Sequence, residues 1–262
     1  MDLDLSGRHA LVGGGSQGIG FAAAIELAKL GADVTVIGRD SARLRSAVAS
    51  LSGFRAQGRF HALQADYADR ESLQRIVGEW IGEHPAQILI NNTGGPAPGP
   101  IAEASESAFL DTFGQHLLCN QLLTRALLPG MRSAGFGRII NVISTSVKEP
   151  IKGLGVSNTV RGAVASWSKT LATELAPLGI TVNNVLPGFT RTARLDGLIA
   201  GKVRSAGVSE DEVAAQMRST VPMGRFADAI EVAAAIAFLA SPAAGYITGI
   251  NLAVDGGRTL SF

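Results

Sequence analysis

A glycine-rich stretch near the start of the chain has the composition of a phosphate-binding turn. Residues 13–20 read Gly-Gly-Gly-Ser-Gln-Gly-Ile-Gly and follow the apolar run 9–12. They fit G-x-G-x-x-G counted from Gly13 and G-x-x-x-G-x-G counted from Gly14. Glycines let the backbone turn tightly beside a pyrophosphate, and a helix that begins here directs free N–H groups at the phosphates. An ordinary strand–helix turn is the alternative. The cofactor-binding residues expected in this turn are Gly14, Ser16, Gln17, Gly18, Ile19 and Gly20.

The residue at the end of the second expected strand, 32–38, determines whether the site prefers NAD or NADP. An acidic residue there would bind the ribose 2′-hydroxyl of NAD. The chain has Arg39 instead, whose guanidinium can pair with a 2′-phosphate, and Arg43 follows one helical turn later. We therefore expect NADP as the cofactor. The alternative is a solvated Arg39 next to the helix cap Asp40.

Two further strand ends carry side chains suited to the adenosine part of a dinucleotide. Asp66, followed by Tyr67, comes after the third expected strand, and its carboxylate can accept a hydrogen bond from the adenine amino group. A loop or cap aspartate is the alternative for Asp66. Asn92, Thr93 and Gly94 follow the fourth strand, where asparagine side chains can tie strands together while the backbone lines the ribose. Turn chemistry alone would also favour these residues.

The elements that must position these residues alternate along the whole chain. Strands are expected at 8–13, 32–38, 59–64, 87–91, 137–143, 180–186 and 249–254, and helices at 18–30, 41–52, 70–82, 105–133, 154–176 and 228–240. Continuously apolar strands suit a parallel sheet that is buried on both faces. We therefore expect an α/β fold, a single Rossmann-type, doubly wound parallel sheet of seven strands with helices on both faces. One domain over 1–262, with a lid over about 190–225, completes the expectation.

Composition limits the classes of function. The 262 residues are 46% hydrophobic and 17% charged, which fits a well-packed globular domain. The net charge of +1 gives no electrostatic footprint for nucleic acid or an anionic membrane surface. The lone Cys119 suits a reducing compartment, and the acidic N-terminus lacks the features of a signal peptide. We therefore expect a cytoplasmic protein. The four histidines show no metal-ligand spacing, so we expect no metal site.

These motifs together resemble the classical short-chain dehydrogenase/reductase family, and within it the β-ketoacyl-carrier-protein reductase type. The resemblance covers nearly the whole chain and rests on the glycine turn, residues 91–94, 138–144, 175–183, Pro187-Gly188 with Thr192, and the terminal 254–257. It implies a strand order of 3-2-1-4-5-6-7, a small-molecule carbonyl or alcohol substrate, and a homo-oligomer, tetramer or dimer, built on the helices near 105–133 and 154–176. It also implies nicotinamide contacts from Pro187, Gly188, Thr190 and Thr192.

The catalytic positions depart from the family pattern. The family uses Ser, Tyr, Lys and a supporting Asn, with Tyr and Lys four residues apart on one helix face. Counted from Ser144, the Tyr position holds Ser157 and the Lys position holds Arg161. Counted back from residues 128–131, the Asn position holds His116. A serine hydroxyl is a far weaker acid than a phenol, and arginine does not release a proton at working pH. The chain thus resembles a divergent subgroup that lacks the standard Tyr/Lys pair.

The candidate catalytic residues are Ser144, Ser157, Arg161 and His116, and the identity of the proton donor stays open. Arg161 is also expected to bind the cofactor, because its guanidinium can hold ribose hydroxyls. A histidine has an intrinsic pKa of about 6.5, which suits an acid; a packing histidine on an apolar helix is the alternative. Lysines 148 and 152 near Ser144 are further candidates, with a solvated loop as the alternative. The basic residues of the lid, which can meet an anionic substrate or lie on a solvated helix face, are Arg191, Arg194, Lys202 and Arg204.

Three functions follow from these observations. The first is an NADP(H)-dependent oxidoreductase that acts on a carbonyl or alcohol with an atypical proton donor. The second is an NADP-binding protein without turnover, a sensor or a partner subunit, because a missing general acid costs about 10²–10⁴ in rate. The third is a structural subunit of a hetero-oligomer that has lost the cofactor.

Overall fold

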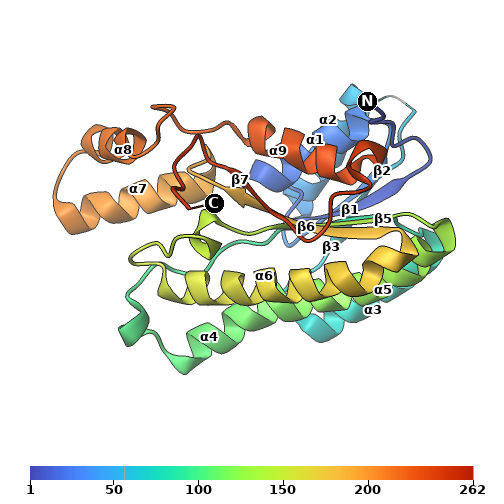
Figure 1. Ribbon diagram of the computed structural model, residues 1–262, viewed down its shortest axis with the longest axis horizontal. Coiled ribbons are helices and arrows are strands. Elements are labelled where there is room, and N and C mark those ends of the chain that lie inside the picture. Colours follow the sequence, from blue (N-terminus) through green and yellow to red (C-terminus); the bar gives the residue numbers. More distant parts are fainter. Residues whose placement is uncertain (56, 262) are drawn as a thin grey trace.

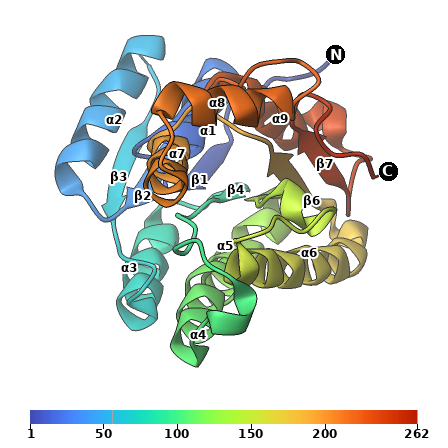
Figure 2. The ribbon, with the colours of Figure 1, turned by 90° about the vertical axis from the view of Figure 1, so that its left-hand side faces the viewer.

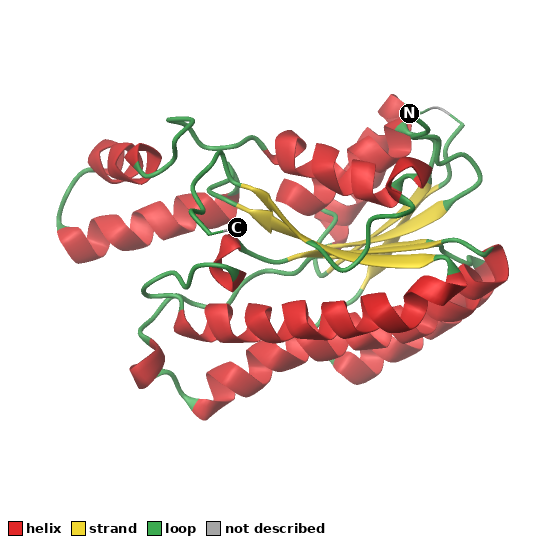
Figure 3. Ribbon diagram, in the orientation of Figure 1, coloured by secondary structure: helices red, strands yellow, loops and turns green. Residues whose placement is uncertain are grey.

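A seven-stranded parallel sheet forms the centre of the protein (Figures 1 and 3). The computed structural model describes residues 1–55 and 57–261. The strand order is β3-β2-β1-β4-β5-β6-β7, and every neighbouring pair is parallel, which confirms the predicted fold class. The strands are β1 (His9–Gly13), β2 (Asp33–Gly38), β3 (Phe60–Gln64), β4 (Ile88–Asn91), β5 (Gly137–Val142), β6 (Ile180–Pro187) and β7 (Asn251–Val254).

Helices cover both faces of the sheet (Figures 1 and 2). Those on one face are α1 (Gly18–Lys29), α2 (Ser41–Phe54) and α9 (Ala229–Ala240). Those on the other face are α3 (Arg70–Glu83), α5 (Cys119–Ala134) and α6 (Gly155–Leu175), with α4 (Glu106–Phe113) packed beside α6. Within the described residues, no helix combines the length and apolar character needed to cross a membrane.

Alternate residues of each strand point into two separate hydrophobic cores, because successive side chains of a strand point to opposite faces of the sheet. Val12 and Ile90 point into the core under α1, α2 and α9. Leu11 and Leu89 point into the core under α3, α5 and α6. All four side chains are fully buried, which explains why these strands read as continuous apolar runs in the sequence.

One predicted helix is interrupted. The expectation of a single helix over 105–133 is wrong, because a π-helical segment, Gly114–Leu118, separates α4 from α5. A side chain at Gly114 would collide with the guanidinium of Arg70 on α3, so the chain passes close to its neighbour here. Single π turns inside helices are frequent at functional sites, and this one carries His116.

The segment between β6 and α9 lies beyond the carboxyl ends of the strands (Figures 1 and 2). It contains α7 (Ala193–Ala206) and α8 (Glu210–Ser219). The two helices enclose a small core of their own, which includes Leu195, Val213 and Phe226. This segment covers the region that the sequence predicts as a lid.

A ladder of asparagine side chains ties four adjacent strands together. The amide of Asn91 on β4 donates to Oδ1 of Asn141 on β5 at 2.8 Å, and Asn141 donates to Oδ1 of Asn184 on β6 at 2.9 Å. Asn184 in turn donates to Oδ1 of Asn251 on β7 at 2.8 Å. Each donor and acceptor pair is also a register pair of the sheet. The ladder therefore fixes the relative heights of the strand ends that carry the site.

Replacing the centre of this ladder will destabilise the fold more than replacing its end. Asn141 is fully buried and makes two of the bonds, so Asn141→Ala leaves Asn91 Nδ2 and Asn184 Oδ1 unpaired in the interior. We expect a loss of about 2–4 kcal/mol in the free energy of unfolding, measured by urea titration. Asn251→Ala, at the exposed end, is the matched control, with a loss of about 1 kcal/mol or less. Equal losses of unfolding free energy for the two variants would contradict a larger contribution from the centre of the ladder.

Candidate active site

The glycine turn between β1 and α1 has no room for side chains. Gly14 and Gly18 adopt φ angles of 55° and 58°, in the left-handed region that favours glycine. A Cβ at Gly14 would lie 2.7 Å from Asn92 Nδ2, and one at Gly20 would collide with the carbonyl oxygen of Gly14. Across the cleft, a Cβ at Gly18 would lie 3.4 Å from the methyl group of Thr192. The turn thus forms a backbone-lined cradle.

The N-terminus of α1 is open to an anion. Gln17 occupies the N-cap position, its side chain makes no capping hydrogen bond, and no acidic residue stands in the first turn. By contrast, Asp40 caps α2 by accepting hydrogen bonds from the N–H groups of Ala42 and Arg43 at 2.9 and 3.0 Å. The first N–H groups of α1 are therefore available to a phosphate. The cradle and this helix end together fit the phosphates of a dinucleotide.

Arg39 is available for a further phosphate. Its side chain is exposed and forms no ion pair with any residue of the described chain. Arg43 is already engaged, with Nη1 donating to Gln17 Oε1 at 2.8 Å and Nε 3.4 Å from Asp40. Asp40, the carboxylate next to Arg39 in the sequence, is therefore engaged by the helix cap and by Arg43.

The predicted adenosine residues take two different roles. Asp66 accepts a hydrogen bond from the N–H of Ala68 at 2.9 Å, as in an aspartate turn, with one carboxylate oxygen left over. The buried Tyr67 supports the glycine turn, since its hydroxyl lies 2.7 Å from the position that a Cβ at Gly13 would take. Burial raises the pKa of Tyr67, and Tyr246 is fully exposed. Neither tyrosine stands where the family has its catalytic one.

Three predicted catalytic residues converge at the carboxyl end of β5. Ser157 and Arg161 lie one turn apart on α6, and Arg161 Nε donates to Ser157 Oγ at 3.2 Å. Arg161 Nη1 donates to the carbonyls of Ile143 at 2.7 Å and Val142 at 3.2 Å. Those two residues immediately precede Ser144. Arg161 therefore joins the helix that carries Ser157 to the strand end that carries Ser144.

Both serine hydroxyls are arranged as hydrogen-bond donors. Ser144 Oγ accepts from the N–H of Ser146 at 3.1 Å, and Ser157 Oγ accepts from Arg161. Each oxygen thus has an N–H group on its acceptor side, and neither hydroxyl donates to an acceptor within the described chain. Their O–H groups remain free to donate to an oxygen atom of a ligand.

The charges of the site come from arginine and not from histidine. Burial and the neighbouring Arg194 lower the pKa of Arg161 to about 10, so Arg161 stays cationic at neutral pH. His116 is buried, and one ring nitrogen, Nδ1, lies 2.9 Å from Thr93 Oγ1. Burial and the charge of Arg161 lower the pKa of His116 to about 3. The imidazole is therefore neutral at pH 7 and holds no ready proton to transfer.

The segment after β6 completes the cleft. Thr190 Oγ1 donates to the carbonyl of Gly188 at 3.2 Å, and Thr192 Oγ1 donates to the carbonyl of Thr190 at the same distance. Pro187 ends β6, and a Cβ at Gly188 would lie 2.7 Å from Asp255 Cα. The four residues that the family resemblance assigns to the nicotinamide therefore lie in one turn, with Thr192 facing the glycine cradle.

Sequence spacing gave no signal for two contacts across the mouth of the site. Arg194 on α7 donates from Nη2 to the carbonyl of Pro96 at 2.8 Å, which links the segment after β6 to the loop after β4. Glu149 accepts hydrogen bonds from the N–H groups of Leu260 and Ser261 at 2.6 and 2.8 Å, which holds the C-terminal segment against the loop after Ser144. Both depend on side-chain direction.

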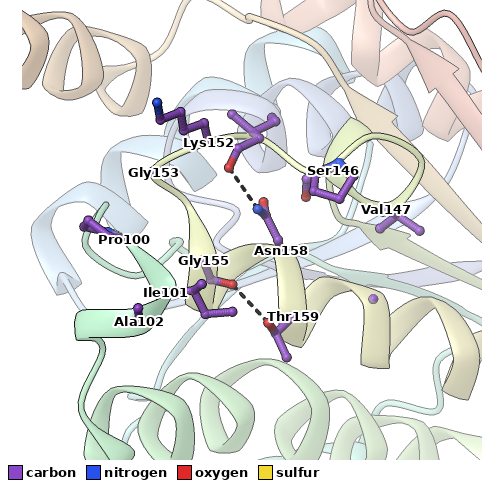
Figure 4. A pocket seen from close by; sticks show the side chains of 13 residues that line it. Pro100, Ile101, Ala102, Ser146, Val147, Lys152, Gly153, Gly155, Asn158 and Thr159 are labelled. Carbon is purple, nitrogen blue, oxygen red and sulfur yellow. Dashed lines mark hydrogen bonds between the residues drawn. The ribbon is translucent and has the colours of Figure 1, made fainter.

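A cavity of about 780 Å³ lies on another face of α6 (Figure 4). Its walls include Ile101, the loop at 150–153, and Asn158 and Thr159. At 3.6 residues per turn, Asn158 and Thr159 are rotated away from the helix face of Ser157. The cavity therefore adjoins the serine site without containing its hydroxyl groups. Lys152 stands at the rim, where it is exposed.

No metal centre accompanies these groups. Among residues 1–55 and 57–261, no three His, Cys, Asp or Glu side chains are placed to hold a metal ion.

Comparison with known proteins identifies relatives over the whole chain. A family model described as enoyl-(acyl carrier protein) reductase matches residues 14–259. The chain is 35% identical to the 3-oxoacyl-[acyl-carrier-protein] reductase FabG of Haemophilus influenzae, covering 98% of this chain and 100% of the relative. It is 31% identical to the NADPH-dependent reductase BacG of Bacillus subtilis, with 98% and 100% covered.

Solved structures agree with these relatives. The structure of L-sorbose reductase from Gluconobacter frateurii, complexed with NADPH and L-sorbose, superposes with a TM-score of 0.93 at 31% identity, covering 100% of both chains. The structure of YwfH, an NADPH-dependent reductase involved in bacilysin biosynthesis, has a TM-score of 0.93 at 30% identity, with 98% of this chain and 100% of the other covered.

Proposed function

The chain belongs to the short-chain dehydrogenase/reductase family of NAD(P)-dependent oxidoreductases, which act on CH–OH and C=O groups, and we propose that it reduces a carbonyl without a proton-donating side chain. The observation that carries this proposal is the arrangement of the two serines. Ser144 and Ser157 each accept an N–H group and keep their O–H groups free to donate.

NADP is the cofactor of this enzyme, as in the similar NADPH-dependent reductases. The glycine cradle and the open end of α1 fit its pyrophosphate. We assign the 2′-phosphate to Arg39, because this exposed guanidinium lacks a carboxylate partner in the described chain. When bound, the reduced cofactor supplies the hydride.

The serines and Arg161 stabilise negative charge on the substrate oxygen. Hydride addition to a carbonyl carbon breaks the C=O π bond and places the electron pair on oxygen. The hydroxyls of Ser144 and Ser157 donate hydrogen bonds to that oxygen. Because the Arg161 cation donates to Ser157 Oγ, it makes the Ser157 hydroxyl a stronger hydrogen-bond donor. Donors fixed in advance at a developing oxyanion contribute about 10²–10³ in rate each. Arg161 thus supports charge stabilisation in place of the family's proton relay.

The proton that completes the reaction comes from water. Serine and arginine do not release a proton at neutral pH, and His116 is already deprotonated there. A water molecule protonates the alkoxide and leaves hydroxide, so the overall reaction consumes one hydride and one proton. The chain thus represents a divergent subgroup of its family.

Restoring the family pair will raise the rate of ketone reduction. The double variant Ser157→Tyr, Arg161→Lys supplies a phenol whose pKa a neighbouring ammonium lowers. We expect a gain of roughly 10²–10⁴ in kcat over Ser157→Ala, Arg161→Lys, measured as NADPH consumption with a ketone panel. No gain, with NADPH affinity unchanged, would contradict a reductase site that lacks only its acid, and would favour an NADP-binding protein without turnover.

Removing the Arg39 charge will weaken the preference for NADP. Arg39→Gln loses a charge-assisted pair, so we expect the Kd for NADP to rise about 10–100-fold, measured by calorimetry, while the Kd for NAD changes little. Arg45→Gln, on the helix α2 that follows Arg39, is the matched control and should leave both affinities unchanged. Equal weakening for NADP and NAD in Arg39→Gln would place the 2′-phosphate elsewhere.

We also propose that the protein is a homo-oligomer, a tetramer or dimer, joined through α4 and α6. Leu110 and Phe113 on α4, with Leu118 just beyond, are large apolar side chains that are 63%, 38% and 39% exposed. Ile101, at the cavity beside α6, is 55% exposed. Light scattering should give a multiple of the 27.0 kDa chain mass, and Leu110→Asp should lower it. A monomeric wild-type protein would contradict this assembly.

A further inference from the structure

Two arginines from different helices meet over one glycine of the loop after β4. A Cβ at Gly95 would lie 3.3 Å from Nη2 of Arg194 and 3.5 Å from Nη2 of Arg161. Arg161 extends from α6 and Arg194 from α7, so the two guanidinium groups reach this point from different helices. Side chains of like charge converge in this way only at a cost, which burial increases.

Neither arginine of this pair is held by an ion pair in the described part of the chain. Arg161 donates from Nε to Ser157 Oγ and from Nη1 to two backbone carbonyls. Arg194 donates from Nη2 to the carbonyl of Pro96. Arg161 Nη2 has no acceptor among these contacts. Burial, and next to it the charge of Arg194, lowers the pKa of Arg161, which agrees with the proximity of the two guanidinium groups.

The pair lies at the catalytic end of the cleft. Arg161 is hydrogen-bonded to the residues that precede Ser144 and to Ser157. The expected binding site of the cofactor phosphates is a different place, the glycine turn, where Gly18 faces Thr192. Arg194 begins close to that end but reaches away from it, to Pro96. An anion held by both guanidinium groups would therefore lie beside the reacting carbonyl.

We propose that Arg161 and Arg194 form a binding site for a substrate carboxylate, so that the preferred substrates are oxo acids. This inference rests on the proposed reductase function, because it names the substrate class of the same site. A carboxylate accepts from two guanidinium groups through its two oxygens, and such charge-assisted bonds are stronger than neutral ones. The carboxylate lies within a few bonds of the carbonyl, because Arg161 contacts Ser157 through Nε and faces Gly95 through Nη2.

A binding measurement tests this site without turnover. Malonate, and its neutral diamide malonamide, are titrated by calorimetry into the protein saturated with NADP. We expect malonate to bind to the wild-type protein and malonamide to bind weakly or not at all. Arg194→Gln should raise the Kd for malonate roughly 10–100-fold, because it removes one charge-assisted contact. Arg191→Gln is the matched control on the same segment, since Arg191 is already paired with Asp228 at 2.9 Å, and it should leave this Kd unchanged.

The same variants separate failure of the site from failure of the function. Acetoacetate and methyl acetoacetate share one ketone, and only the first carries a carboxylate. If both are reduced, Arg194→Gln should raise KM for acetoacetate alone. If neither is reduced, Arg194-dependent binding of malonate still supports the carboxylate site, while the reductase proposal fails.

Three results would overturn the carboxylate site. The first is malonate binding that is absent or equal in wild-type and Arg194→Gln proteins. The second is an equal effect of Arg191→Gln, which would indicate a general effect of surface charge. The third is a loss of NADP affinity in Arg194→Gln with malonate binding intact, which would assign the anion to the phosphates of the cofactor.

Discussion

The asparagine ladder from Asn91 to Asn251 is the constraint on which the site depends. It links four strands side chain to side chain and in register, at the end of β4, near the end of β5, within β6 and at the start of β7. In open α/β sheets, ligands bind at the carboxyl ends of the strands. The loop after β4, the Ser144 turn after β5 and the turn at 187–192 after β6 all begin a few residues beyond this ladder. A shift of one strand by one register would separate groups that must act together.

Arg161 changes the chemistry that is available at the catalytic positions. The family pair of tyrosine and lysine moves a proton, whereas Ser157 and Arg161 form a fixed donor beside Ser144. The arginine is hydrogen-bonded to two strand-end carbonyls, so its charge is held in place before the substrate binds. Fixed dipoles of this kind lower the energy of a developing oxyanion without rearrangement. The same cation, paired with Arg194 over Gly95, extends the site toward an anionic substrate group.

Much of this arrangement could be predicted from the sequence, because it depends on local spacing. The glycine turn, the apolar strands and the four-residue spacing of Ser157 and Arg161 each have a period that a single sequence displays. The π-helical break at Gly114 could not be predicted, because the close approach of Arg70 on α3 to this segment is a tertiary contact that local spacing does not show. The direction of Arg194 and the donor state of the serines depend on side-chain rotamers and tertiary neighbours. The roles of the catalytic residues therefore needed the three-dimensional structure.

The central claim is that hydride transfer proceeds here without an ionising side chain as the acid. The pH dependence of the single-turnover rate of NADPH oxidation tests it most directly, with an oxo acid or ketone that the enzyme reduces. We expect a rate that is nearly constant between about pH 6 and 9, because serine, arginine and neutral His116 do not titrate in this range. A sigmoidal profile with a midpoint inside this range, abolished by His116→Asn or by replacing Lys148 or Lys152, would identify a side-chain acid and contradict the claim.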